Sequence, residues 1–255
     1  MAIDPIAARF HKGFYAVRSS VLMMYVTAVL AVGKMILHQR GIYMDKNGAG
    51  LVVKRLEELY PAAACALEYE GEAWKLLVMA RLSAQCTDKR VNIVSSELFE
   101  KYTTAESLAM AELADVENIV RPCGLYRVKA KDIIAECQRL CGECHGVMPD
   151  DIDKLLEFQG VGRKIANLIV GDIYKKPAVV ADTHCIRISA RLGLTPKGTK
   201  DPLKTEKTLK KLIEPEKQND FCHRLVMFGR EYCKAQGFDC GSCPLADLCE
   251  KQITI

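Results

Sequence analysis

The hydrophobic positions of this chain recur every three or four residues, which is the spacing of an amphipathic helix. The first such run is ended by Pro61. The predicted helices cover residues 51–59, 73–83, 91–99, 105–108, 116–119, 128–140, 183–192, 205–213 and 220–232. No stretch alternates with a period of two for long enough to predict a strand, although residues 178–181 form a short extended run. The sequence therefore predicts an all-α fold.

A helix, a sharp turn and a second helix are predicted between residues 150 and 170. An aspartate at 150–151 can cap the first helix, and Gly160 and Gly162 break it on either side of Val161. Glycine tolerates positive φ and lets another backbone approach closely. Such a turn points backbone N–H groups outward at a helix start, where they suit a phosphate oxygen and bind DNA without reading its sequence. An ordinary turn is the alternative that these residues alone leave open.

Lys164 and Asp182 are the residues with candidate catalytic chemistry. Lys164 lies in the first turn of the second helix, beside Arg163. A cation at this position opposes the helix dipole, and the basic neighbour adds to the effect, so both favour the neutral, nucleophilic amine. Asp182 begins the helix that follows the extended run. Its carboxylate can cap that helix or stabilise a developing positive charge.

Four cysteines near the C-terminus predict a metal centre. The chain has 12 cysteines and no evident cleavable signal peptide, which suits a reducing cytoplasm where disulfides are not expected. Four clustered thiolates bind either zinc or an iron–sulfur cluster, and their spacing does not choose between them. The candidate ligands are Cys233, Cys240, Cys243 and Cys249. A second group is attributed to packing on one helix face; it comprises Cys137, Cys141, Cys144 and His145.

Net charge does not by itself indicate nucleic-acid binding. The value of +4 arises within residues 1–43, which hold five basic residues and one acidic residue. Local basic clusters are therefore the relevant feature. Within the helix at 128–140, Lys129, Lys131 and Arg139 are predicted to face outward. The apolar stretch at 21–37 falls short of the roughly 20 residues of a membrane helix, and Met44 is the predicted native start.

Five separated motifs resemble, in order, those of the endonuclease III family of bifunctional DNA glycosylase/lyases in the helix-hairpin-helix superfamily. They lie at 82–88 (Leu-Ser-Ala-Gln-Cys-Thr-Asp), 124–126 (Gly-Leu-Tyr), 160–167 (Gly-Val-Gly-Arg-Lys-Ile-Ala-Asn), 180–184 (Val-Ala-Asp-Thr-His) and the four-cysteine array. The resemblance runs from about residue 44 to residue 250. Two positions depart from the family pattern: Gln159 replaces the usual Pro, and Ala181 replaces a common Val.

The resemblance implies two helical lobes with DNA bound at the cleft between them. A six-helix bundle at 66–176 would carry the hairpin, and residues 44–65 with 177–255 would form the second lobe. Residues 1–43 stay unassigned. The family also implies a C-terminal [4Fe-4S] cluster rather than zinc, with Lys164 as the catalytic lysine and Asp182 as the catalytic aspartate. The DNA-contacting residues it implies are Gln85, Leu125, Gly160, Val161, Gly162 and Arg163.

The implied activity is base-excision DNA repair. The enzyme would release damaged, oxidised pyrimidines and then cut 3′ to the abasic site by β-elimination through a Schiff base at Lys164. The implied partner is duplex DNA with damaged bases or abasic sites, bound by a monomer in the cytoplasm at the nucleoid, with no membrane partner. Two alternatives remain: a monofunctional glycosylase of the superfamily, which would lack this lysine, and a non-enzymatic DNA-binding iron–sulfur module. Borohydride trapping on abasic DNA distinguishes them.

Overall fold

The computed structural model of the chain describes residues 44–251, so the predictions for residues 1–43 lie outside it. Within the described residues all regular secondary structure is helical, which confirms the all-α prediction. None of these helices is long and apolar enough to cross a bilayer. The elements are α2 (Lys46–Leu59), α3 (Ala73–Leu82), α4 (Asp88–Lys101), α5 (Ala105–Ala109), α6 (Leu113–Val120), η1 (Arg121–Cys123), α7 (Tyr126–Gly142), α8 (Ile152–Leu156), α9 (Arg163–Asp172), α10 (Thr183–Leu192), α11 (Pro202–Leu212), η2 (Pro215–Lys217) and α12 (Gln218–Glu231).

Side-chain caps explain where several helices begin. Asp45 caps α2 by accepting a hydrogen bond from the Gly48 amide at 2.7 Å. Thr104 and Ser107 form a reciprocal capping box at the start of α5. Asp201 precedes Pro202, which occupies the first helical position of α11, where a missing N–H costs nothing. Such caps satisfy amides that have no acceptor within the helix.

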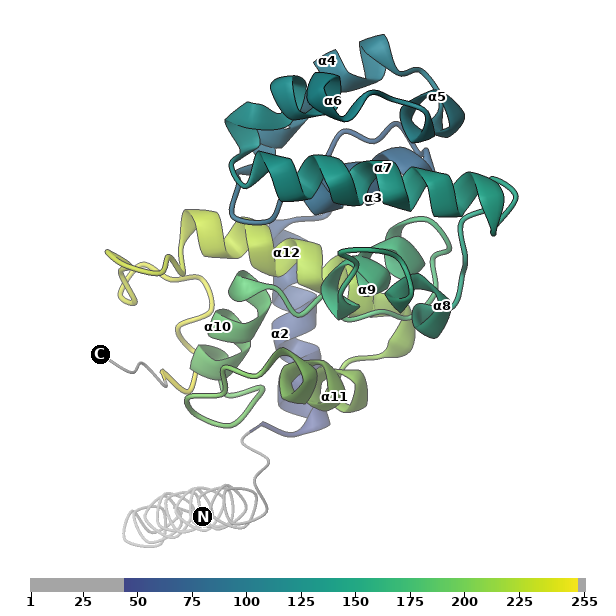
Figure 1. The fold of residues 1–255 in the computed structure, drawn as a ribbon. Helices are drawn as coiled ribbons and strands as arrows, with labels where there is room; N and C mark the ends of the chain where they lie inside the picture. The colour runs from purple at the N-terminus through teal and green to yellow at the C-terminus, as the bar shows by residue number, and fades with distance from the viewer. Residues whose placement is uncertain (1–43, 252–255) are drawn as a thin grey trace, which may run out of the picture.

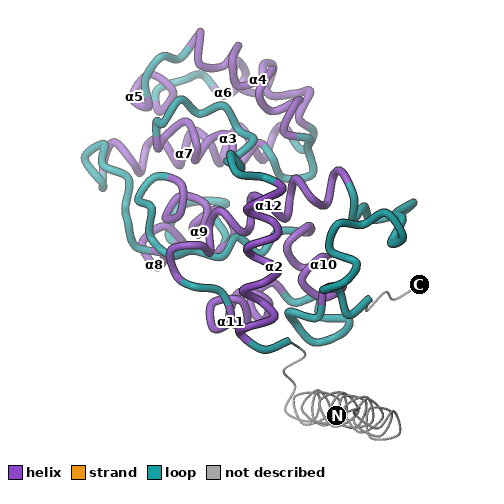
Figure 2. Tube along the Cα trace, turned by 180° about the vertical axis from the view of Figure 1, so that it is seen from behind, coloured by secondary structure: helices purple, strands orange, loops and turns teal. Residues whose placement is uncertain are grey.

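The helices form two groups joined by the hairpin (Figure 1). In one group α7 packs against α3, α5 and α6, and α4 packs against α3 and α6. In the other, α12 packs against α2 and α10, and α11 packs against α10. Helix α9 contacts α8, α3 and α12, so the hairpin lies between the groups. The view from behind shows the same arrangement (Figure 2). The domain boundaries at 66 and 176 remain a prediction.

Helix α3 is central to the core, because Leu76, Leu77 and Met79 are all fully buried. Helix α7 differs from the prediction at one position. Lys129 does not face outward; its side chain is fully buried, whereas Lys131 is exposed. The charge of Lys129 favours a surface position, but a lysine can be buried where its ammonium finds hydrogen-bond acceptors.

Candidate active site and metal centre

The hairpin joins α8 to α9 through a tight turn. Asp151 caps α8, and its Oδ1 accepts hydrogen bonds from two amides of the first turn. Gly160 has φ of +74°, a left-handed conformation that favours glycine. The Val161 side chain is buried, and its amide donates to the Phe158 carbonyl at 3.1 Å. The Val161 side chain and amide are therefore both engaged within the turn itself.

The start of α9 presents amides without internal acceptors. Gly162 is the N-cap residue and has no side chain with which to cap the helix. Within residues 44–251, the amides of Arg163, Lys164 and Ile165 donate to no acceptor. These N–H groups lie at the positive end of the helix dipole, so the site suits a phosphate oxygen.

The two hairpin glycines have different roles. A Cβ on Gly160 would lie 2.6 Å from Arg81 Nε and 2.7 Å from Asp132 Oδ2. These two side chains form a mostly buried ion pair between α3 and α7, with Nε donating to Oδ2 at 2.8 Å. Gly162 has φ of −100°, and a Cβ there would meet nothing within 4 Å. Of the two glycines, only Gly160 uses the positive φ that glycine tolerates.

This difference predicts opposite outcomes for two alanine substitutions. Gly160→Ala is expected to lower the free energy of unfolding by about 1–3 kcal/mol, because it adds left-handed strain and a clash with the ion pair. Gly162→Ala, the matched control, is expected to stay within about 0.5 kcal/mol of the parent. Urea unfolding of both variants measures the difference. Equal stabilities would contradict the packing of the turn on Arg81 and Asp132.

Lys164 and Arg163 are adjacent in sequence but differ in their partners. Arg163 forms two hydrogen bonds with Glu206 of α11, at 2.9 and 2.6 Å, and Glu206 also binds Lys210. Burial opposes the charge of Glu206, but these hydrogen bonds outweigh it and hold the carboxyl pKa below its usual value. Lys164 is exposed and forms no hydrogen bond or ion pair with another described residue. The charge of Arg163 is thus offset by Glu206 rather than left to act on Lys164.

Asp182 caps α10, which is one of the two roles that its position allows. Its Oδ1 accepts a hydrogen bond from the Cys185 amide at 2.7 Å. The side chain is only half-buried. Within the described part of the chain no ion pair joins Asp182 to Lys164. The cap also fixes the orientation of the carboxylate.

Gln85 and Leu125 occupy two exposed loops with unusual backbone geometry. Gln85 has φ of +55° and Leu125 has φ of +49°, in the left-handed region that side chains larger than glycine seldom adopt. Leu125 is 57% exposed although it is apolar. The adjacent Tyr126 ring lies near the guanidinium groups of Arg121 and Arg127, at 5.1 and 5.3 Å. Strained, exposed residues beside basic groups are typical of a binding site, here one suited to nucleic acid.

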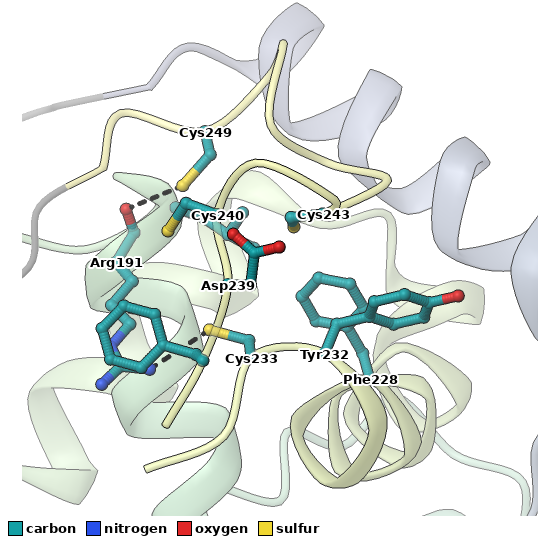
Figure 3. Close-up of a pocket in the computed structure, with 10 residues that line it drawn as sticks. Arg191, Phe228, Tyr232, Cys233, Asp239, Cys240, Cys243 and Cys249 are labelled. Carbon is teal, nitrogen blue, oxygen red and sulfur yellow. Dashed lines mark hydrogen bonds between the residues drawn. The ribbon is translucent and has the colours of Figure 1, made fainter. Parts of the chain in front are cut away.

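The four C-terminal cysteines line one pocket next to the end of α12 (Figure 3). Arg191 donates to Cys233 Sγ at 3.4 Å, and its carbonyl accepts from the Cys249 thiol at 3.3 Å. The amide of Lys251 donates to Cys249 Sγ at 3.3 Å. N–H donors and a guanidinium beside the sulfurs stabilise the negative charge of thiolate ligands. The pocket-lining cysteines are Cys233, Cys240, Cys243 and Cys249.

The donor set of this pocket fits an iron–sulfur cluster. The four cysteines surround a pocket whose other walls include Phe228 and Leu192. Sulfur-only ligation suits an iron–sulfur cluster as well as zinc, so the donor set by itself is compatible with either.

The second cysteine group belongs to the packing of α7, as predicted. Cys137 is fully buried, and burial raises the pKa of its thiol. Cys141 and Cys144 are half-buried and pack against the hydrophobic core. These cysteines therefore contribute small apolar side chains to the packing of the core.

Comparison with known proteins identifies the family. Residues 78–215 match the family described as HhH-GPD superfamily base excision DNA repair protein. Endonuclease III of Synechocystis sp. is 40% identical over 211 residues, which cover 82% of this chain and 95% of that protein. The chain belongs to the endonuclease III family. Endonuclease III of Bacillus subtilis is 38% identical over 197 residues, 77% of this chain and 89% of that protein, and that of Escherichia coli K12 is 33% identical over 207 residues, 81% and 97%.

Solved structures of the endonuclease III family have the same fold. A trapped endonuclease III–DNA covalent intermediate, described as an estranged-adenine complex, matches with a TM-score of 0.77 and 39% identity. The match covers 82% of this chain and 97% of that one. A thermostable thymine-DNA glycosylase, at 17% identity and a TM-score of 0.71, shares the fold alone.

The sequence did not predict the roles of three buried charged residues around the hairpin and its neighbouring loops. Asp132 binds Arg81 of α3, Glu206 binds Arg163 of α9, and Lys129 binds two backbone carbonyls. A signal for Lys129 was present, because it shares the helical face of Ile133 and Leu140. The partners of Asp132 and Glu206 lie 51 and 43 residues away in sequence, beyond the reach of local patterns.

Proposed function

We propose that this chain releases oxidised pyrimidines from duplex DNA and then cuts the strand 3′ to the abasic site. Its family comprises DNA glycosylases with AP lyase activity, and the observation that carries the assignment is Lys164. This exposed amine has no partner among the described residues and lies in the first turn of a helix that lacks a side-chain cap. An exposed amine without a salt-bridge partner is available as a nucleophile.

The damaged nucleotide must leave the base stack before it can react. Hairpin amides at the start of α9 hold a backbone phosphate and place the sugar within reach of Lys164. In this proposal Gln85 and Leu125 enter the duplex from their two loops. Arg163 then positions α9 through Glu206, in addition to any contact that it makes with DNA.

Base release requires a nucleophile and a stabilised positive charge. As the bond from C1′ to the base breaks, positive charge builds on the sugar and the Asp182 carboxylate stabilises it. The Lys164 nitrogen forms a bond to C1′, and the base leaves with the electron pair and takes up a proton. Opening of the sugar ring gives the Schiff base. Loss of a C2′ proton then expels the 3′ phosphate, and hydrolysis returns the amine.

The test uses a labelled duplex that carries one oxidised thymine, and a second duplex with an abasic site. Incubation with the protein and borohydride is expected to give a covalent adduct on both duplexes. Without borohydride, the product is a strand cut 3′ to the lesion. A protein that releases the base but gives neither adduct nor cleavage would be monofunctional. A protein that binds both duplexes without reaction would be a binding module.

The cofactor of the C-terminal pocket is proposed to be a [4Fe-4S] cluster held by four thiolates. The sulfur-only donor set, the pocket and the family membership support it. When bound, the cluster supplies structural cross-links between loop segments rather than reaction chemistry. Arg55 of α2 supports the same loop by donating to the Pro244 carbonyl at 2.7 Å. Because the substrate is duplex DNA, the proposal also places the protein at the nucleoid, and a monomer is expected to be the active form.

The purified protein is expected to be yellow-brown, with about four irons and negligible zinc. Cys240→Ser should lose the colour and loosen the chain from about residue 232 onward, because the metal supplies local folding energy. Cys141→Ser, a matched change in the packing group, should retain iron. Metal analysis and visible absorbance measure both variants. One zinc and no iron would overturn the cluster assignment and leave the chemistry of Lys164 unaffected.

A further inference from the structure

Lys129 connects the two loops that carry Gln85 and Leu125. Its ammonium is fully buried and donates to the Leu82 carbonyl at 2.9 Å and to the Cys123 carbonyl at 2.8 Å. The Lys129 amide donates to the Leu125 carbonyl at 3.1 Å. Lys129 therefore donates hydrogen bonds to three backbone carbonyls in or beside the two loops.

Both carbonyls that the ammonium binds belong to helix ends. Leu82 is the last residue of α3, and Cys123 is the last residue of η1. Carbonyls at a helix C-terminus have no N–H donor within the helix and carry the negative end of the dipole. A cation shared between two such ends therefore fixes their relative position. Burial lowers the pKa of Lys129, and the two carbonyls favour the charged form.

Each of the two helix ends is followed by one of the strained residues. Gln85 comes three residues after Leu82, and Leu125 comes two residues after Cys123. Both have positive φ and exposed side chains. Such conformations persist only where the surroundings fix them. The shared ammonium is a contact of the kind that fixes both at once.

We propose that Lys129 is a positioning residue that holds Gln85 and Leu125 at the separation needed for their joint entry into the duplex. The inference rests on the proposed function, since it is base extrusion that Lys129 would support. Lys129 is buried, so it does not touch DNA itself. Its removal should impair the steps that require the base to leave the stack more than the chemistry at Lys164.

Lys129→Met tests this, because methionine has similar length but no donor and leaves both carbonyls unpaired. Base release from the oxidised-thymine duplex is expected to fall at least tenfold in single-turnover assays. Borohydride trapping on a preformed abasic site, where no base has to be extruded, is expected to fall less than threefold. A 2-aminopurine opposite the lesion, whose fluorescence rises when stacking is lost, should brighten less than with the wild-type protein.

Ile133→Ala is the matched control, since Ile133 is fully buried one turn further along α7 and makes no bond to either loop. Both variants are compared at a temperature where circular dichroism shows them folded. The inference would be overturned if Lys129→Met and Ile133→Ala lost base release and trapping to the same extent. It would also be overturned if Lys129→Met released the base at the wild-type rate. Lys129→Gln, with donors on a shorter side chain, undergoes the same comparison where the Met variant does not fold. Failure of the proposed function itself appears separately, as absence of release and trapping by the wild-type protein.

Discussion

Lys164→Ala is expected to abolish strand cleavage and borohydride trapping, with a loss on the order of 10³-fold or more, as removal of a nucleophile produces. No other lysine lies at the start of α9, and Arg163 stays protonated and bound to Glu206. Folding should be unaffected, because Lys164 is exposed, has no partner among the described residues and alanine favours a helix. Gel analysis of a labelled abasic duplex measures both products.

Lys154→Ala provides a matched control for this change. Lys154 is an exposed lysine in α8, the other helix of the hairpin. Its removal takes away the same charge from the same motif and should leave trapping intact. Full lyase activity in Lys164→Ala would mean that another amine is the nucleophile. Loss of activity in both variants would instead point to phosphate binding as the common cause.

Hydrophobic periodicity was sufficient to locate most helices. The run predicted at 73–83 is α3, Ala73–Leu82, and the helix predicted to follow Asp182 is α10, Thr183–Leu192. The second hairpin helix begins at Arg163, one of the two predicted starts. These elements are determined by local features: apolar spacing, a capping carboxylate and a glycine turn.

What surrounds the hairpin was not predictable in the same way. Gly160 is required because Arg81 and Asp132 lie directly beside it, and both come from helices distant in sequence. Arg163 was expected to add positive charge near Lys164, but Glu206 of α11 neutralises it. Such pairings depend on how whole helices pack, and sequence spacing within one helix does not contain that information.

These long-range contacts join the hairpin to neighbouring helices and engage the charges beside its lysine. The turn lies on a buried ion pair at Gly160, and α9 is tied to α11 through Arg163. The charges of Arg81 and Arg163 thus already have partners within the described chain, whereas Lys164 has none there. In the proposed reaction, an unpaired amine at a helix start can attack without first breaking a salt bridge.

Asp182→Asn is expected to lose most base release, by about 10²–10³-fold, while DNA affinity and stability change little. The amide oxygen of asparagine can still accept the Cys185 amide hydrogen, so α10 keeps its cap. It carries no charge, however, and does not stabilise the positive sugar. Single-turnover release from the oxidised-thymine duplex and thermal unfolding measure the two effects separately.

Asp201→Asn is the matched control for Asp182→Asn, because Asp201 also caps its helix, α11, through Oδ1, which accepts from two amides there. The same chemical change at that cap should leave base release near the wild-type rate. A large fall in melting temperature for Asp182→Asn with normal release would assign Asp182 to capping alone. If Asp182→Asn loses release at an unchanged melting temperature while Asp201→Asn keeps release, the loss comes from the missing charge of Asp182. The cap cannot be its cause, because both variants keep an amide oxygen that accepts the same hydrogen bonds.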